Sequence, residues 1–180
     1  MWVKTKCSLH AISVTPTPKA FSPQVVLAQW DLDYLRLLGQ KMGAPERTVC
    51  FFTGDGGLQM TIQELGTIME YGTDVKIILL NNNFLGNVRQ WQELFFQCRF
   101  SQTPMINPDF VAIAKAYGIA AENVETRDQL DDAIARMLNH KGAYMLNVNI
   151  DYTDMIFPMT PPGAGVDTIM LNATEMYQID

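Results

Sequence analysis

Thr48-Val49-Cys50-Phe51-Phe52-Thr53-Gly54-Asp55-Gly56-Gly57 is the stretch that decides the fold of this 180-residue chain. A short apolar run that stops at turn residues is typical of a buried strand, here over residues 48–53. The glycines that follow let the backbone turn sharply and approach another group closely. The stretch therefore predicts a buried strand whose end carries one carboxylate, that of Asp55.

A helix and a second strand follow this turn. Leu58, Ile62, Leu65 and Met69 fall on one face of a helix over residues 58–71, and Gly72 is placed to end it in a left-handed conformation. A second apolar run, residues 75–80, predicts another buried strand. Strand, helix and strand in this order predict two parallel strands joined by a right-handed crossover.

The remaining signals extend the same pattern. We expect Asn107 to cap a helix that Pro108 opens and Gly118 closes. Thr126 and Gln129 form a capping box before another helix, and residues 143–150 read as a buried strand. Alternating strands and helices predict a three-layer α/β domain with a mostly parallel sheet.

The first 40 residues are different. Pro16, Pro18 and Pro23 indicate an extended arm over residues 1–24, and residues 25–39 permit a helix that Gly39 would end.

Composition excludes several classes of protein. A formal charge of −6 and a pI near 4.8 argue against nucleic-acid binding, which needs clustered Lys and Arg. Three widely spaced cysteines indicate neither a disulfide framework nor a zinc cluster, and no stretch is long and apolar enough to span a membrane. We therefore expect a cytoplasmic protein that binds neither membrane nor nucleic acid.

Two strand ends carry oxygen ligands. The run over residues 75–80 ends in Asn81-Asn82-Asn83, and ligands of parallel sheets bind beyond the carboxyl ends of the strands. Mg²⁺ prefers oxygen ligands and usually takes one or two protein carboxylates beside phosphate groups. Backbone N–H groups after the glycines suit a phosphate. Asp55 and Asn82 thus predict a magnesium-diphosphate site, although Gly-Asp-Gly alone is often only a turn.

The segments around these residues resemble a known family. Gly54-Asp55-Gly56 and Asn81-Asn82 are similar to the signature of thiamine-diphosphate enzymes, whose thiamine-diphosphate-binding fold the resemblance implies. The flanking segments resemble the large catalytic subunit of acetolactate synthase (acetohydroxyacid synthase), in separated blocks between Lys41 and Gly165. These flanks are residues 58–65, 85–95 and 157–163.

The resemblance implies roles for individual residues. Asp55, the side-chain oxygen of Asn82 and the backbone carbonyl of Phe84 would hold Mg²⁺. The cofactor would lie against Gly54, Gly56 and Gly57 and against the turn Leu85-Gly86-Asn87-Val88. The backbone amides of Gly56 and Gly57 would bind the diphosphate. Asn87 stands where the family usually has methionine. Trp91 would shape the pocket for the second 2-keto acid, although its helical spacing from Val88 and Phe95 also fits a plain core residue.

The family decarboxylates pyruvate on thiamine diphosphate and joins the product to a second pyruvate or to 2-ketobutyrate, in branched-chain amino acid biosynthesis. The resemblance implies a homo-oligomer and a regulatory small subunit as partners. The activating glutamate belongs to a pyrimidine-binding domain of a neighbouring subunit, and FAD, where present, to a middle domain. This sequence matches neither domain, so no catalytic residue is assigned and the chain alone is expected to be inactive.

Other interpretations stay open. The chain could be a non-catalytic truncated fragment or a self-associating module without useful cofactor binding, or a doubly wound domain for a nucleotide or a flavin. Residues 1–40 lack the glycine-rich sequence of the family, with Gln29 to Leu38 in its place. We therefore expect residues 1–40 to form an arm that orders poorly or results from a frame disruption, and residues 41–180 to form the thiamine-diphosphate and Mg²⁺ domain.

Overall fold

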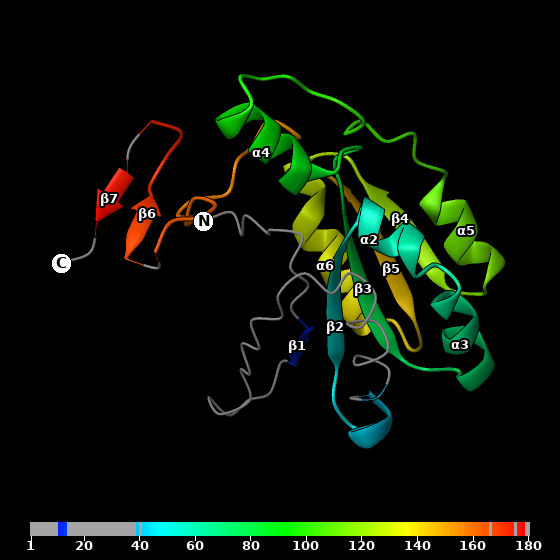
Figure 1. The fold of residues 1–180 in the computed structure, drawn as a ribbon. Coiled ribbons are helices and arrows are strands. Elements are labelled where there is room, and N and C mark those ends of the chain that lie inside the picture. The colour runs from blue at the N-terminus through cyan, green and yellow to red at the C-terminus, as the bar shows by residue number, and fades with distance from the viewer. Residues whose placement is uncertain (1–10, 14–38, 40, 166, 175, 179–180) are drawn as a thin grey trace.

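The fold is built on a five-stranded sheet with the order β1-β2-β3-β5-β4 (Figure 1). The computed structural model describes residues 11–13, 39, 41–165, 167–174 and 176–178. The strands are β1 (Ala11–Ser13), β2 (Val49–Gly54), β3 (Val75–Asn81), β4 (Ala120–Val124) and β5 (Tyr144–Asn149). The last four run parallel, whereas β1 pairs antiparallel with β2 at the edge.

Helices cover both faces of this sheet. Side chains of α2 (Asp55–Met60), α3 (Glu64–Tyr71) and α5 (Phe110–Ala116) pack on one face, and α6 (Leu130–Asn139) packs on the other. A short 3-10 turn, η1 (Arg127–Gln129), leads into α6, whereas α4 (Gly86–Phe95) lies beyond the carboxyl ends of the strands (Figure 1). The predicted three-layer, mostly parallel α/β fold is confirmed.

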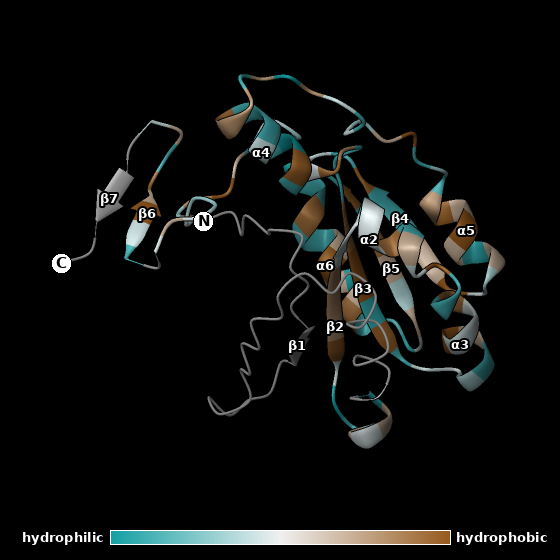
Figure 2. Cartoon of the chain, in the orientation of Figure 1, coloured by the Kyte–Doolittle hydropathy of each residue, from teal (hydrophilic) through white to brown (hydrophobic). Residues whose placement is uncertain are grey.

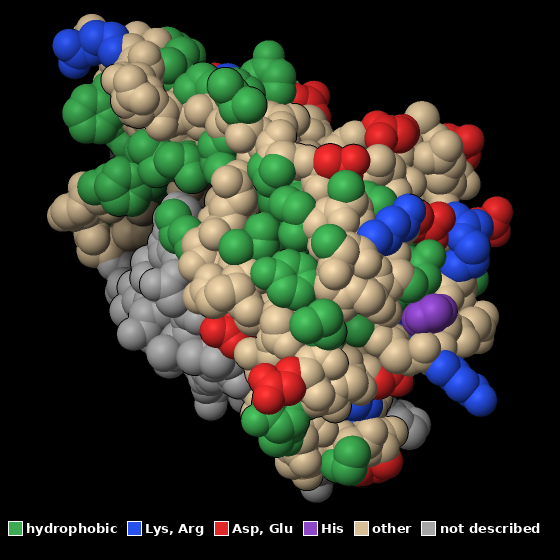
Figure 3. Space-filling model, turned by 90° about the vertical axis from the view of Figure 1, so that its right-hand side faces the viewer, with side chains coloured by type: hydrophobic (Ala, Val, Ile, Leu, Met, Phe, Trp, Pro, Cys, Tyr) green, Lys and Arg blue, Asp and Glu red, His purple; other side chains and the backbone are tan. Residues whose placement is uncertain are grey.

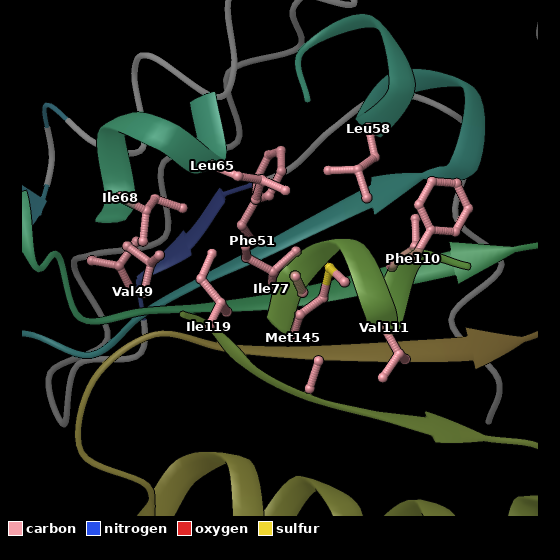
Figure 4. Packing of buried hydrophobic residues seen from close by; sticks show 14 residues of the cluster. Val49, Phe51, Leu58, Leu65, Ile68, Ile77, Phe110, Val111, Ile119 and Met145 are labelled. Carbon is pink, nitrogen blue, oxygen red and sulfur yellow. The ribbon is translucent and has the colours of Figure 1, made fainter. Parts of the chain in front are cut away.

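Two apolar clusters hold the layers together. In Figure 4, Phe51 of β2 and Ile77 of β3 lie beneath Leu58 of α2 and Leu65 of α3. On the opposite face Ala133 and Met137 of α6 pack against Val124, Leu146 and Val148. In Figure 2, β2 is brown over much of its length, whereas β4 carries teal segments. Burial of apolar side chains on both faces explains why β2, β3 and β5 read as continuous apolar runs.

Several predicted elements are confirmed. The predicted strands over residues 48–53, 75–80 and 143–150 correspond to β2, β3 and β5 within one residue at each end. Gly72 ends α3 with a φ of 56°, the left-handed conformation expected of it. Thr126 and Gln129 form the predicted capping box.

The predicted helix over residues 58–71 is wrong in its extent, because two helices occupy this stretch. A turn separates α2 from α3, and in it the Thr61 hydroxyl donates to the Gly57 carbonyl oxygen at 3.0 Å. Backbone bonds between residues three apart follow, such as Glu64 N to Thr61 O at 3.0 Å. Met69 was expected on the buried face, yet it is 56% exposed, because the second helix starts anew after this turn.

Three further expectations need correction. The cap of α5 is Asp109, whose carboxylate accepts from Ala112 N at 2.9 Å, so neither Asn107 caps this helix nor Pro108 opens it. Residue 39 and residues 41–43 are helical, so Gly39 does not end a helix. The rest of the predicted arm and helix over residues 1–39, apart from β1, lies outside the described residues. Strand β4 was not predicted.

The C-terminal segment is fastened to α4. Gln90 donates through Nε2 to the Ile156 carbonyl oxygen and accepts from Ile156 N, both at 3.1 Å, and Nε2 also lies 3.1 Å from Met159 Sδ. Beyond it, β6 (Thr168–Met170) and β7 (Met176–Gln178) form a separate two-stranded sheet. In the described part of the chain no helix has the length and apolarity needed to cross a membrane.

Candidate functional site

The end of β2 sets Asp55 deep in the molecule. Gly54 is in register with Leu80 of β3, so the residues that follow these two strands share one edge of the sheet. Asp55 is the first residue of α2 and is only 2% exposed. Burial raises the pKa of this carboxyl group, whereas hydrogen bonds from the Asn107 side chain and the Gly56 and Asn83 backbone act in the opposite direction.

Asn107 joins the two predicted motifs. Its Nδ2 lies 2.7 Å from Asp55 Oδ2, 2.8 Å from Asn81 Oδ1 and 3.0 Å from Asn83 Oδ1. Its own oxygen accepts from Gln59 Nε2 at 2.8 Å. The Asp55 carboxylate after β2 is therefore joined to Asn81 and Asn83 at the end of β3, the neighbours of the predicted ligand Asn82, through a residue predicted to be a helix cap.

The Asn82 side chain engages its own turn. Its Oδ1 accepts from the backbone N–H of Phe84 at 3.0 Å. Its Nδ2 lies close to Gly86: a Cβ added to that glycine would be 3.2 Å from this nitrogen. The amide of Asn82 and the backbone of Phe84, the two residues implied as metal ligands beside Asp55, are thus direct neighbours.

A second stretch of chain runs alongside this turn. Phe84 bridges Pro104 in antiparallel fashion, Leu85 N donates to Thr103 O at 2.9 Å, and Met105 N donates to Asn83 O at 2.8 Å. We call residues 103–107 the strap, because they pair with the turn and end at Asn107.

Aromatic rings fix the other side of the turn. The Phe84 ring stacks on Tyr152 with their centroids 4.6 Å apart. The Arg89 guanidinium lies over the rings of Phe84, Phe100 and Tyr152 at 5.7, 4.9 and 5.2 Å, and it pairs with Glu93 at 2.9 Å. The backbone of Phe84 is therefore held from both sides.

The glycines at the start of α2 lie close to side chains of neighbouring segments. A Cβ on Gly56 would lie 3.1 Å from Leu85 Cδ2 and 3.5 Å from Met105 Sδ, and a Cβ on Gly57 would lie 3.2 Å from Thr53 Oγ1. The N–H of Gly56 donates to Asp55 Oδ1 at 3.1 Å. The first motif therefore faces Leu85 of the second.

Helix α4 borders a cavity of about 700 Å³. The predicted residues Asn87, Val88 and Trp91 all line it, and its other described lining residues are Gln90, Gln92, Phe96, Arg99, Met159 and Thr160. Trp91 is 47% exposed, with the Phe95 ring edge-on at 6.3 Å between ring centroids, so the alternative that it is a plain core residue is wrong. Exposed hydrophobic side chains gather at the top of the view in Figure 3, the end at which Figure 1 places α4.

Sequence reasoning missed Asn107 and the strap as parts of this site. Asn107-Pro108 looks like the start of a helix, whereas the Asn107 side chain makes a tertiary contact with Asp55, 52 residues away. A usable signal was that Asp109 is an equally good cap, which leaves Asn107 without a local role.

Comparison with known proteins identifies the class of this domain. Residues 37–148 match the model of the family described as thiamine pyrophosphate enzyme, C-terminal TPP binding domain. This match covers more than half of the residues of the chain, so the chain belongs to this family.

The relatives are more specific. The chain is 44% identical over 128 residues to the acetolactate synthase isozyme 2 large subunit of Escherichia coli (strain K12), with 71% of this chain and 23% of the relative covered. It is 41% identical over 128 residues to acetolactate synthase of Arthrospira platensis, covering 70% and 22% of the two chains. It is 37% identical over 130 residues to the mitochondrial acetolactate synthase catalytic subunit of Saccharomyces cerevisiae, covering 72% and 19%. The resemblance to acetolactate synthase is confirmed, and the chain spans about a quarter or less of the length of these relatives.

Proposed function

We propose that this chain is the cofactor-binding domain of an acetolactate synthase catalytic subunit, and that it holds thiamine diphosphate through Mg²⁺. The observation that carries the proposal is the buried Asp55 carboxylate after β2, which the Asn107 side chain joins to Asn81 and Asn83 at the end of the neighbouring parallel strand β3. The family match supports thiamine diphosphate as the cofactor, and the names of the relatives support acetolactate synthase as the enzyme.

The donor set fits Mg²⁺. Asp55 offers a carboxylate, Asn82 an amide oxygen and Phe84 a backbone carbonyl, all of them oxygen ligands of the kind that Mg²⁺ prefers. An amide oxygen has two lone pairs, so Asn82 Oδ1 can accept from Phe84 N at 3.0 Å and still offer a lone pair to a cation. A single carboxylate limits the repulsion of a diphosphate at the same place.

The diphosphate would lie against the glycines. Gly54, Gly56 and Gly57 place no side chain between their backbone N–H groups and a diphosphate. A Cβ on Gly56 would lie 3.1 Å from Leu85 Cδ2, so this position favours glycine. Thiamine diphosphate supplies the electron sink for decarboxylation, and the residues of this chain bind and orient it. The turn Leu85-Gly86-Asn87-Val88 would run along the cofactor.

The second 2-keto acid would enter beside Trp91. The cavity of about 700 Å³ has an indole ring, aliphatic groups and amides in its lining, which suits a small substrate with an apolar end and a polar end. Asn87 makes this wall more polar than the usual methionine would. We propose pyruvate as donor and pyruvate or 2-ketobutyrate as acceptor.

The complete activity requires more than this chain. We propose that the pyrimidine-binding domain of a neighbouring subunit completes the site, that the assembly is a cytoplasmic homo-oligomer with a regulatory small subunit, and that FAD, where present, binds outside this chain. Residues 41–180 are the cofactor domain in this proposal and residues 1–40 an arm outside it. The isolated chain is expected to form no acetolactate.

Calorimetric titration of the 180-residue chain with thiamine diphosphate in the presence of Mg²⁺ tests the proposal. We expect saturable heat that disappears in Asp55→Ala and weakens strongly in Asn82→Ala. Asn123→Ala is the control, because it also removes an asparagine side-chain hydrogen bond at a strand end, to Asn147 at 2.8 Å.

Silence from the wild-type chain would support the alternative of a fragment without useful cofactor binding. One observation favours that alternative: several large apolar side chains near α4 are exposed, namely Val88, Trp91, Phe95, Phe96 and Phe100. Sedimentation at several protein concentrations would then show self-association.

A further inference from the structure

We propose that Asn107 is a positioning residue of the metal site, whose side-chain amide fixes the Asp55 carboxylate and ties it to Asn81 and Asn83 at the end of β3. This inference rests on the proposed function and extends it to a residue outside both sequence motifs. Asn107 would act through Asp55 and would not itself bind the cation.

The contacts of Asn107 Nδ2 give this role its geometry. Three oxygens from two strand ends, on Asp55, Asn81 and Asn83, lie within 3.0 Å of one nitrogen. A side-chain amide has only two hydrogens, so three acceptors exceed what it can satisfy. The oxygens of this cluster therefore keep accepting capacity, which suits a place next to a cation.

The orientation of the Asn107 amide is itself fixed. Gln59 Nε2 donates to Asn107 Oδ1 at 2.8 Å, and this contact turns the nitrogen of the amide toward the carboxylate. The strap holds the backbone, because Met105 N donates to Asn83 O at 2.8 Å and Leu85 N to Thr103 O at 2.9 Å. The strap thus holds the backbone near Asn107, and Gln59 holds the Asn107 side chain.

The chemistry of an amide explains why this residue suits the position. A hydrogen bond to a carboxylate is stronger than one between neutral groups and orients the oxygens. A lysine or arginine at this place would orient Asp55 equally well but would neutralise it. Asn107 adds hydrogens without charge, so the negative charge of Asp55 stays available to a divalent cation.

The test measures metal binding directly. Mn²⁺ serves as the probe, because it shares the preference of Mg²⁺ for oxygen ligands and has a paramagnetic resonance spectrum that reports its ligand symmetry. The 180-residue chain is titrated with Mn²⁺ at saturating thiamine diphosphate, well below the unfolding temperature. We expect Asn107→Ala to weaken Mn²⁺ binding by about 10-fold to 100-fold, the usual effect of losing a partner that orients a metal ligand. The spectrum of the bound ion is also expected to change.

A second variant covers the case in which Asn107→Ala does not fold. Gln59→Ala leaves Asn107 in place and removes only the contact that sets its orientation, so we expect a smaller loss of Mn²⁺ affinity in the same direction. Asn123→Ala is the control and is expected to bind Mn²⁺ as the wild type does.

The outcomes separate this inference from the proposed function. If wild type binds Mn²⁺ with thiamine diphosphate, Asp55→Ala does not, and both Asn107→Ala and Gln59→Ala match wild type, only the role of Asn107 is overturned. A lower unfolding temperature with an unchanged dissociation constant and spectrum would mean a purely structural residue and would also overturn it. A wild-type chain that binds neither ligand overturns both proposals.

Discussion

Replacing Gly86 by alanine should separate folding from metal binding. An ideal Cβ on Gly86 lies 3.2 Å from Asn82 Nδ2, so the Asn82 amide has to shift by a few tenths of an ångström. Metal–ligand distances tolerate only about 0.2 Å. Gly86 is the first residue of α4, where alanine favours the helix by at most about 0.5–1 kcal/mol. We expect unchanged or slightly higher stability, with about tenfold weaker Mg²⁺-dependent binding of thiamine diphosphate, or about 1.4 kcal/mol.

Thermal unfolding followed by circular dichroism and calorimetric titration measure the two effects of Gly86→Ala. Gly66→Ala is the matched control, because its Cβ would lie 3.7 Å from Tyr117 Cε1, an ordinary contact, inside α3. It should raise the stability by about 0.5–1 kcal/mol and leave binding unchanged. Wild-type affinity in Gly86→Ala would refute the assignment of Asn82 as a ligand that this contact positions. A loss of stability above about 2 kcal/mol would show that Gly86 serves the fold instead.

Three other predictions concern the fold. Leu65 is 0% exposed, so Leu65→Ala leaves a cavity in the core and should lower the free energy of unfolding, measured by denaturant titration, by about 2–5 kcal/mol. A loss below about 1 kcal/mol would contradict the packing described. The hydrogen bond from Arg136 lowers the pKa of Glu122, so the stability from this pair is present above its ordinary value of 4.5 and is lost as the pH falls through the lowered folded-state pKa. Glu122→Gln should therefore flatten the dependence of stability on pH below about 4.5, and an unchanged slope in acid denaturation would exclude this pair as its source. Gln90→Ala should release residues 156–159 and speed limited proteolysis there, whereas a wild-type cleavage rate would show that other contacts hold the segment.

The parallel strands could be predicted because burial on both faces leaves a direct trace in the sequence. Strands β2, β3 and β5 are apolar runs that end in turn residues, and their order along the chain implies the crossover. Strand β4 escaped prediction since its sequence, Ala120-Ala121-Glu122-Asn123-Val124, has small and polar residues. Its pairing with β5 makes it a strand, and that pairing is a tertiary contact.

The site could be predicted only as far as its local motifs extend. Asp55 and Asn82 follow apolar runs, and the rule for parallel sheets places both at one edge. The contact of Asp55 with Asn107 joins residues 52 positions apart, and it depends on how the strap packs against the turn after β3. Similarly, the break between α2 and α3 depends on the Thr61 hydroxyl, which the spacing of apolar residues does not reveal.

The pairing of the turn after β3 with the strap has a consequence for how this domain can diversify. The chain leaves this turn after Leu85 and returns at Thr103, and a backbone hydrogen bond of 2.9 Å joins these two residues. Residues 86–102, which include α4 and Trp91, thus form an insertion whose two ends are joined by this hydrogen bond. The length or composition of such an insertion can change while the pairing of Leu85 with Thr103 stays the same. Under the proposed function, exchanging residues 89–102 between related domains should alter the wall around Trp91 while Gly86 and the turn beside Asn82 stay in place.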